Sequence, residues 1–131
     1  MADEITTTVN LSVTNPSSVT IGHNKSSVKF DQATAKADVH KTSQEVGTSY
    51  EVVELGDVTV ANAPFVAITN CSTVAGNYLV ITFDGANAAL RIPPGATNLI
   101  TPDITVTDAN FKLKFATAAD VAEVSAAESN E

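Results

Sequence analysis

The side chains most often used for metal binding and nucleophilic chemistry are scarce in this sequence. Its two histidines, His23 and His40, and its single cysteine, Cys71, lie far apart, and neither histidine belongs to an H-x-x-x-H or H-E-x-x-H pattern. A zinc site needs three or four such ligands in one place. We therefore predict no metal site, and we expect both histidines on the solvated surface and Cys71 as an ordinary thiol. One cysteine also excludes a disulfide framework.

A pair of carboxylates is the next chemistry to consider, because glycosidases place two of them across a sugar bond. Glu51 and Glu54 would lie on opposite faces of an extended segment, so they do not converge. Four aspartates stand among turn residues, where an Asp side chain commonly binds its own backbone. They are Asp57, Asp84, Asp103 and Asp108. A calcium ion at Asp84, Asn87 and nearby carbonyls is the remaining alternative, although the D-x-[DN]-x-[DN]-G loop is absent.

Other catalytic patterns are missing as well. The sequence has no G-x-S-x-G nucleophile elbow, no G-x-G-x-x-G loop and no Walker lysine. Tryptophan is absent, and Tyr50 and Tyr78 are a poor supply of rings for a sugar-binding platform. We expect these tyrosines in the core or in an interface, with the hydroxyl exposed. The prediction is a protein that is not an enzyme, with no catalytic residues, no metal and no bound cofactor.

The charge balance restricts the partners. The chain of 131 residues carries 7 Lys and Arg against 15 Asp and Glu, a formal net charge of −8. Binding to nucleic acid or to anionic lipid depends on clustered Lys and Arg, so we expect neither partner. Residues 1–5 are acidic where a secretory signal would be basic, and no apolar run reaches the ~20 residues of a membrane span. We expect synthesis in a reducing cytoplasm.

Alternation of apolar and polar residues with a period of two is the main structural signal, and it is cleanest in 111–115. Pro and Gly fall between the alternating runs and end them. The expected strands are 5–14, 19–21, 28–30, 35–46, 49–55, 58–60, 65–69, 78–83, 89–92, 98–100, 104–107 and 111–115. Short strands punctuated in this way predict an all-β fold, either a β-sandwich or a barrel. We expect 22–27 to be a hairpin loop, 35–46 an exposed edge strand and 65–69 a central strand.

The C-terminal segment leaves two alternatives open. Residues 117–120 resemble a capping box, and Val121 and Val124 lie at helical spacing, which favours a helix. The all-β context favours a strand at 121–125, and we take the strand as the prediction. The chain is then one domain, 1–125, in which 1–14 forms an N-terminal strand or arm suited to exchange with a neighbour. An acidic flexible tail, 126–131, follows.

Two groups of residues carry a resemblance to a known family. Residues 47–58 read G-T-S-Y-E-V-V-E-L-G-D-V and are followed by F-V-A-I-T-N at 65–70. Further on, Y-L-V-I-T-F-D-G at 78–85 leads to L-R-I-P-P-G at 90–95. This order of strands and turns, over roughly residues 45–116, resembles small virion structural proteins of tailed bacteriophages, in particular capsid decoration (cement) proteins.

The resemblance implies a single-domain, jelly-roll-like β-sandwich of short antiparallel strands, usually trimeric. It implies a structural protein on the capsid surface of the virion that binds the major capsid protein and stabilises the shell. A tail or fibre-base component and a carbohydrate- or cell-surface-binding module are the alternatives. We further expect residues 5–13 to add to a neighbouring sheet edge, and Val66 and Ile68 to pack against a sister subunit.

Overall fold

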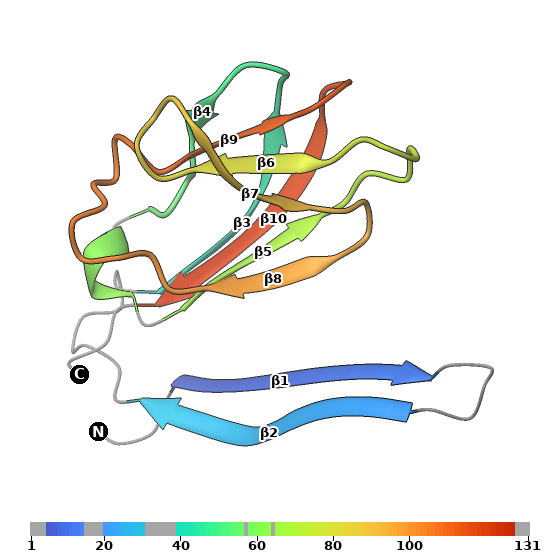
Figure 1. Ribbon diagram of the computed structural model, residues 1–131. Helices are drawn as coiled ribbons and strands as arrows, with labels where there is room; N and C mark the ends of the chain where they lie inside the picture. The colour runs from blue at the N-terminus through green and yellow to red at the C-terminus, as the bar shows by residue number, and fades with distance from the viewer. Residues whose placement is uncertain (1–4, 15–19, 31–38, 57, 64, 128–131) are drawn as a thin grey trace.

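The structure, a computed structural model, describes residues 5–14, 20–30, 39–56, 58–63 and 65–127. For 5–14, 20–30 and residue 39 it describes the backbone only. The described chain is all-β, with one short 3-10 helix, η2, at Val60–Asn62 (Figure 1). Its strands are β1 Ile5–Thr14, β2 Thr20–Phe30, β3 Val39–Val46, β4 Glu51–Val52, β5 Val66–Asn70, β6 Leu79–Thr82, β7 Ala88–Ile92, β8 Thr97–Ile100, β9 Lys112–Phe115 and β10 Asp120–Ala127.

Eight of these strands form two four-stranded antiparallel sheets that face each other as in a β-sandwich (Figure 1). One sheet has the order β3-β10-β5-β8 and the other has the order β4-β9-β6-β7. The all-β, sandwich-like architecture predicted from the sequence is confirmed. β5 lies inside its sheet and β3 lies at an edge, as their sequence patterns predicted.

The strand pairs are nested along the chain. β3 pairs with β10, β4 with β9, β5 with β8, and β6 with β7, every pair being antiparallel. The segment from β3 to β10 is therefore one long four-level hairpin whose levels fall alternately in the two sheets. Two further pairings, β10 with β5 and β9 with β6, join the levels within each sheet.

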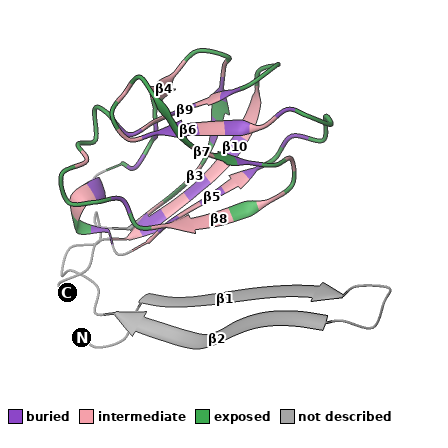
Figure 2. Cartoon of the chain, in the orientation of Figure 1, coloured by how far each residue is buried: buried purple, intermediate pink, exposed green. Residues whose placement is uncertain are grey.

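The core lies between the two sheets and follows the period-two pattern of the strands (Figure 2). In β9, Leu113 and Phe115 are fully buried whereas Lys112 and Lys114 are only partly buried, as the alternation predicted. Phe111 is also buried, and its ring stacks on that of Phe83 with centroids 5.8 Å apart. Burying apolar side chains of this size contributes about 1.5–3 kcal/mol each.

Val66 and Ile68 correct one expectation about the surface. Both side chains are completely buried, and they belong to the core of their own chain. They alternate in β5 with the half-buried Ala67 and Thr69, which occupy the outer face. The expectation that Val66 and Ile68 pack against a sister subunit is therefore wrong, because the second sheet already covers them.

β1 and β2 form a separate two-stranded antiparallel sheet. The register runs from Ile5 opposite Phe30 to Thr14 opposite Thr20, with an irregularity between Thr7 and Val9. The predicted strand 5–14 is confirmed. The expected hairpin of 19–21 with 28–30 is wrong, because 20–30 is one continuous strand and pairs with β1.

Three other short segments differ from the expected strands. Residues 58–60 lead into helix η2, and 104–107 form a turn followed by irregular chain instead of a strand. The expected strand 49–55 shrinks to the two residues of β4, after which the chain leaves the sheet. In each case a few β-branched or apolar residues suggested a strand, but no neighbouring strand extends far enough to pair with them.

The C-terminal segment is a strand, so the helical alternative is wrong. β10 is buried at every second residue from Ala122 to Ala126, a period that no helix produces. It extends to Ala127, two residues beyond the expected limit at 125. The expected tail therefore overlaps the strand at 126 and 127, and residues 128–131 lie outside the described residues.

Candidate functional site

His40 is less exposed than the sequence suggested. Its side chain is half-buried at the start of β3, and its Nε2 atom is buried without a hydrogen-bond partner. It lines an open hollow of about 370 Å³ together with Leu55, Gly56 and Asp108, among other residues. The expected solvated position of His40 is thus wrong. The other histidine, His23, lies in β2, where the structure describes only the backbone.

Metal-ligating side chains are not grouped in the described part of the chain. Among residues 39–56, 58–63 and 65–127, no three His, Cys, Asp or Glu side chains lie where they could hold one ion. Cys71 is an exposed free thiol that follows β5 directly. Asp57 lies outside the described residues.

Asp84 organises the turn between β6 and β7. Its Oδ1 atom accepts hydrogen bonds from the Thr82 hydroxyl and from the backbone N–H groups of Ala86 and Asn87, at 2.7–2.9 Å. Its Oδ2 atom accepts a hydrogen bond from Asn87 Nδ2 at 2.9 Å. The backbone and side chain of Asn87, followed by Ala86 and Thr82, hold the pKa of Asp84 well below its usual range. The Asp84 carboxylate, the candidate calcium ligand, is therefore occupied by hydrogen-bond donors of its own turn.

The other turn aspartates also bind backbone groups. Asp103 Oδ2 accepts hydrogen bonds from the Thr105 hydroxyl and backbone N–H, which lower the pKa of Asp103. Asp108 accepts a hydrogen bond at 2.8 Å from the Val60 N–H, which lies 48 residues earlier in the chain at the beginning of helix η2. The prediction that these residues cap backbone is confirmed for Asp84 and Asp103, whereas Asp108 caps a distant segment.

Glu51 and Glu54 make hydrogen bonds to different parts of the chain. Glu51 Oε2 accepts the Gly47 N–H at 2.9 Å and so closes the turn before β4. Glu54 is exposed, and its backbone N–H donates to Gln44 Oε1 at 2.9 Å. The structure does not bring the two carboxylates together around a shared substrate position.

Basic side chains gather on the outer face of the sheet β4-β9-β6-β7. Lys114 of β9 stands opposite Val80 of β6, which stands opposite Arg91 of β7, so these three residues form one row across three strands. Lys112 lies two residues from Lys114 on the same face. The Lys114 ammonium lies 4.7 Å from the centre of the Tyr50 ring. Similarly, the Arg91 guanidinium lies 4.7 Å from the centre of the Tyr78 ring.

We call Arg91, Lys112 and Lys114, with the rings of Tyr50 and Tyr78, the basic face. Both tyrosines are half-buried, and each ring has a cation over one of its faces. The sequence pattern did not reveal this face, although the alternation of Lys112 and Lys114 with Leu113 and Phe115 did predict two outward lysines. Only the strand order reveals that Arg91 joins them.

Comparison of the chain with protein-family models, with curated proteins and with solved structures finds no match. In the part of the chain that the structure describes, no helix has the length and apolar character needed to cross a bilayer. The candidate surfaces of this protein are therefore defined by its own geometry: the separate β1–β2 hairpin, the basic face and the hollow at His40.

Proposed function

We propose that the eight strands β3 to β10 form a jelly roll. The nested pairing supports this assignment, because a jelly roll is a double-sheet fold of eight strands in two Greek keys. Each level of the long hairpin contributes its two strands to the same sheet, and successive levels alternate between the sheets. The sheet orders β3-β10-β5-β8 and β4-β9-β6-β7 are those that such wrapping produces.

We further propose that the chain is a virion structural protein of a tailed bacteriophage, a capsid decoration protein that acts as a homotrimer. Jelly rolls recur in viral capsid domains, although a fold alone does not assign a function. The family resemblance of residues 45–116 supports the same class. In this role the protein binds the outer surface of the head and stabilises the shell against disassembly.

The observation that carries this proposal is the separate hairpin. β1 and β2 have 10 and 11 residues, and they are hydrogen-bonded to each other but to neither sheet of the sandwich. A two-stranded hairpin alone is marginal in water, and its outer edges are templates for a further strand. Strand addition to a shell subunit or to a sister protomer would complete the hydrogen bonds at such an edge.

The test uses virions purified from the phage whose genome encodes the chain. A decoration protein is present at a copy number close to that of the shell protein, as measured by quantitative mass spectrometry. A few copies per particle would instead indicate a tail component, and absence from the particle would contradict the proposal. Saturable glycan binding by the free protein would favour a carbohydrate-binding module.

A second measurement tests the hairpin itself. Deleting residues 1–14 removes β1 and is expected to abolish shell binding, while thermal unfolding shows whether the sandwich remains folded. Light scattering of the full chain is expected to give three times the 13.6 kDa mass of one chain. Unchanged trimer formation and unchanged shell binding after the deletion would contradict a role of β1 in assembly.

A further inference from the structure

The basic face gathers positive charge on a chain that is acidic overall. Three of the seven basic residues of the sequence lie on it, while the whole chain carries 15 acidic residues. In the described part of the chain one salt bridge occurs, between Lys41 and Glu123 on the opposite sheet, at 3.4 Å. Arg91, Lys112 and Lys114 thus have no carboxylate partner among the described residues. The carboxylate of Asp84, which follows β6, already accepts hydrogen bonds from groups of its own turn.

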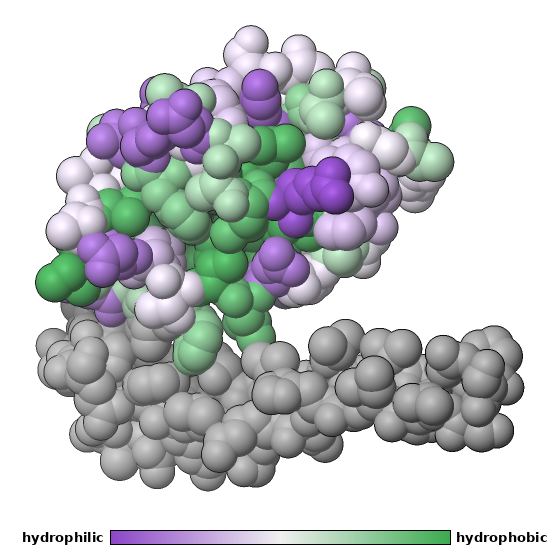
Figure 3. All heavy atoms as spheres, viewed as in Figure 1, coloured by the Kyte–Doolittle hydropathy of each residue, from purple (hydrophilic) through white to green (hydrophobic). Residues whose placement is uncertain are grey.

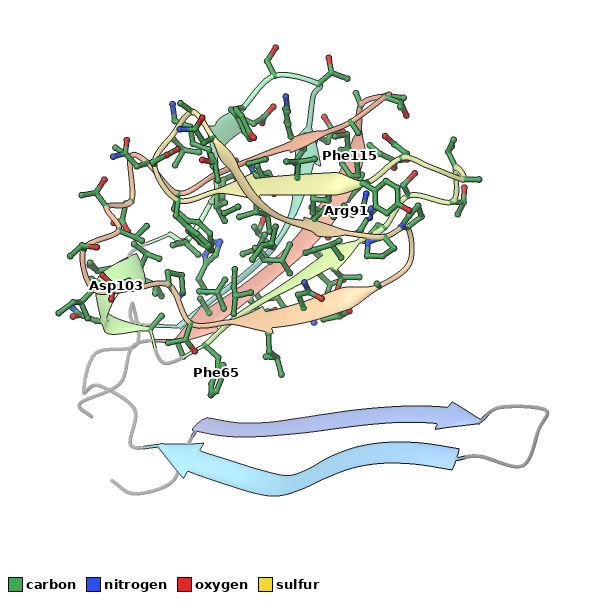
Figure 4. The ribbon with its side chains drawn as sticks, viewed as in Figure 1. Phe65, Arg91, Asp103 and Phe115 are labelled. Carbon is green, nitrogen blue, oxygen red and sulfur yellow. The ribbon has the colours of Figure 1, made fainter. Side chains whose placement is uncertain are left out.

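The cations of the basic face are held in place before any partner arrives. Each of the two 4.7 Å contacts, Arg91 on Tyr78 and Lys114 on Tyr50, restricts a long side chain that would otherwise sample many rotamers. Binding of a partner therefore costs these side chains less conformational entropy than it would cost side chains without an aromatic contact. Figure 4 shows Arg91 toward one end of the sandwich, away from Asp103 in the loop that follows β8.

The spacing of these cations matches an extended peptide. Lys112 and Lys114 are two residues apart on one strand, which is about 7 Å, and alternate side chains of an extended chain repeat at the same distance. Arg91 lies two strands away from Lys114, about 10 Å across the sheet. Apolar side chains flank the cations: the half-buried Val80 stands between Lys114 and Arg91, whereas Val52, 45 % exposed, stands opposite Lys112 on the other side of β9. The mixture of apolar and hydrophilic side chains on the visible side of the sandwich is seen in Figure 3.

We infer that the basic face binds an extended, carboxylate-rich segment of a protein partner, with Asp or Glu at every second position. The segment lies along β9, two of its carboxylates pair with Lys112 and Lys114, and Arg91, about 10 Å to one side across the sheet, adds attraction at longer range. The aliphatic parts of the segment contact Val52 on one side of β9 and Val80 on the other. This inference concerns a surface distinct from the hairpin and does not depend on where the protein acts.

A carboxylate segment fits this surface better than a nucleic acid. Stacking of bases needs free ring faces, and Tyr50 and Tyr78 each have one face covered by a cation. The two ligands are separated by direct competition.

The experiment measures fluorescence anisotropy of a labelled ten-residue peptide of alternating Glu and Thr, titrated with the full chain at 0.15 M salt. Saturable binding is expected, and a peptide of alternating Gln and Thr is expected not to bind. Lys114→Gln is expected to weaken binding by about three- to fivefold, and Lys112→Gln with Lys114→Gln by about tenfold or more. Lys41→Gln removes the same charge from the opposite sheet and is the matched control, expected to leave affinity unchanged.

Several results would overturn the inference. One is the absence of saturable binding. Another is that Lys41→Gln weakens binding as much as Lys114→Gln does, which would indicate an effect of net charge alone. Tighter binding of a ten-nucleotide oligothymidylate than of the peptide would assign the face to nucleic acid. Self-association of the wild-type chain that Lys112→Gln with Lys114→Gln abolishes would assign the face to a second copy. Arg91→Gln, at a different strand, gives an independent variant if the lysine pair fails to fold, as thermal unfolding would show.

Discussion

The side-chain amide of Gln44 donates from Nε2 to the carbonyl oxygen of Val52 at 2.9 Å, and so joins β3 of one sheet to β4 of the other. The same amide accepts the Glu54 N–H through Oε1 at 2.9 Å. Gln44 is 4 % exposed. The buried Gln44 side chain therefore binds the backbone of Val52 and Glu54 in the way that a neighbouring strand would.

Replacing Gln44 by Leu is expected to lower the free energy of unfolding by roughly 2–4 kcal/mol, because it leaves a carbonyl and an N–H without partners at about 1–3 kcal/mol each. Urea unfolding measures the difference. Ser43→Ala, at an exposed position of the same strand, is expected to stay within about 0.5 kcal/mol of the wild type. Equal stability of both variants would show that water replaces the amide.

The completely buried side chain of Asn77 connects two loops, one between β5 and β6 and the other between β9 and β10. It donates through Nδ2 to the Ser72 hydroxyl and the Ala118 carbonyl, and its Oδ1 accepts from Thr117 and Ala118. Asn77→Ala is expected to cost roughly 2–4 kcal/mol, since several buried groups lose their partner at once. Thermal unfolding tests this, with the exposed Thr73→Ala as the control. A loss below that of the control would contradict a structural role for the network.

Substitutions at Gly56 and Gly76 distinguish the cost of backbone strain from the cost of a steric clash. Both have positive φ, 58° and 80°, but a Cβ at Gly56 would lie 2.6 Å from His40 Nδ1 whereas a Cβ at Gly76 meets nothing within 4 Å. Gly76→Ala is expected to cost about 1 kcal/mol for the left-handed conformation, and Gly56→Ala about 2–3 kcal/mol because the ring must also move. Adding His40→Ala should bring the cost of Gly56→Ala close to that of Gly76→Ala, and a double-mutant cycle measures this coupling.

The low pKa of Asp84 predicts an acid dependence of stability. An ordinary Asp has a pKa near 3.9 when unfolded, and that of Asp84 is lower in the fold because donors from Asn87, Ala86 and Thr82 stabilise the carboxylate. The stabilisation is complete above the unfolded pKa and is lost as the pH falls through the folded pKa. Asp84→Asn is therefore expected to be less stable than the wild type at pH 7, and the difference should narrow below about pH 4. Glu45→Gln, which removes an exposed carboxylate of β3, is the comparison variant, and an equal narrowing in that variant would contradict a specific role of Asp84.

The alternation of side chains was sufficient to predict the strands whose one face is buried. β6 and β9 follow their patterns closely, since Leu79, Ile81, Leu113 and Phe115 all point to the core. The same local signal failed where tertiary pairing decides, as at 58–60 and 104–107, because two or three β-branched residues do not form a strand without a neighbour. It also failed at β2, where Asn24 to Ser27 have the composition of a loop but pair with β1.

The candidate surfaces required the strand order. Nothing in the sequence places Arg91 in one row with Lys114, because 23 positions separate them and only the pairings of β7 and β9 with β6 align them. The buried Nε2 of His40 was equally hidden, since the residue that covers its ring, Gly56, lies on a later segment. The turn carboxylates were predictable because Asp84 and Asp103 act within two or three residues of themselves.

The nested pairing also governs how the polypeptide acquires its structure during synthesis. β10 lies between β3 and β5, so the strand made after all the other described strands occupies the interior of its sheet. Until residue 127 has left the ribosome, β3 has no sheet to join and β5 keeps an open edge. Such long-range contacts slow folding, because the loop-closure entropy must be overcome before they form. Translation of this chain is therefore expected to end in one late, cooperative closure instead of stepwise folding from its N-terminus.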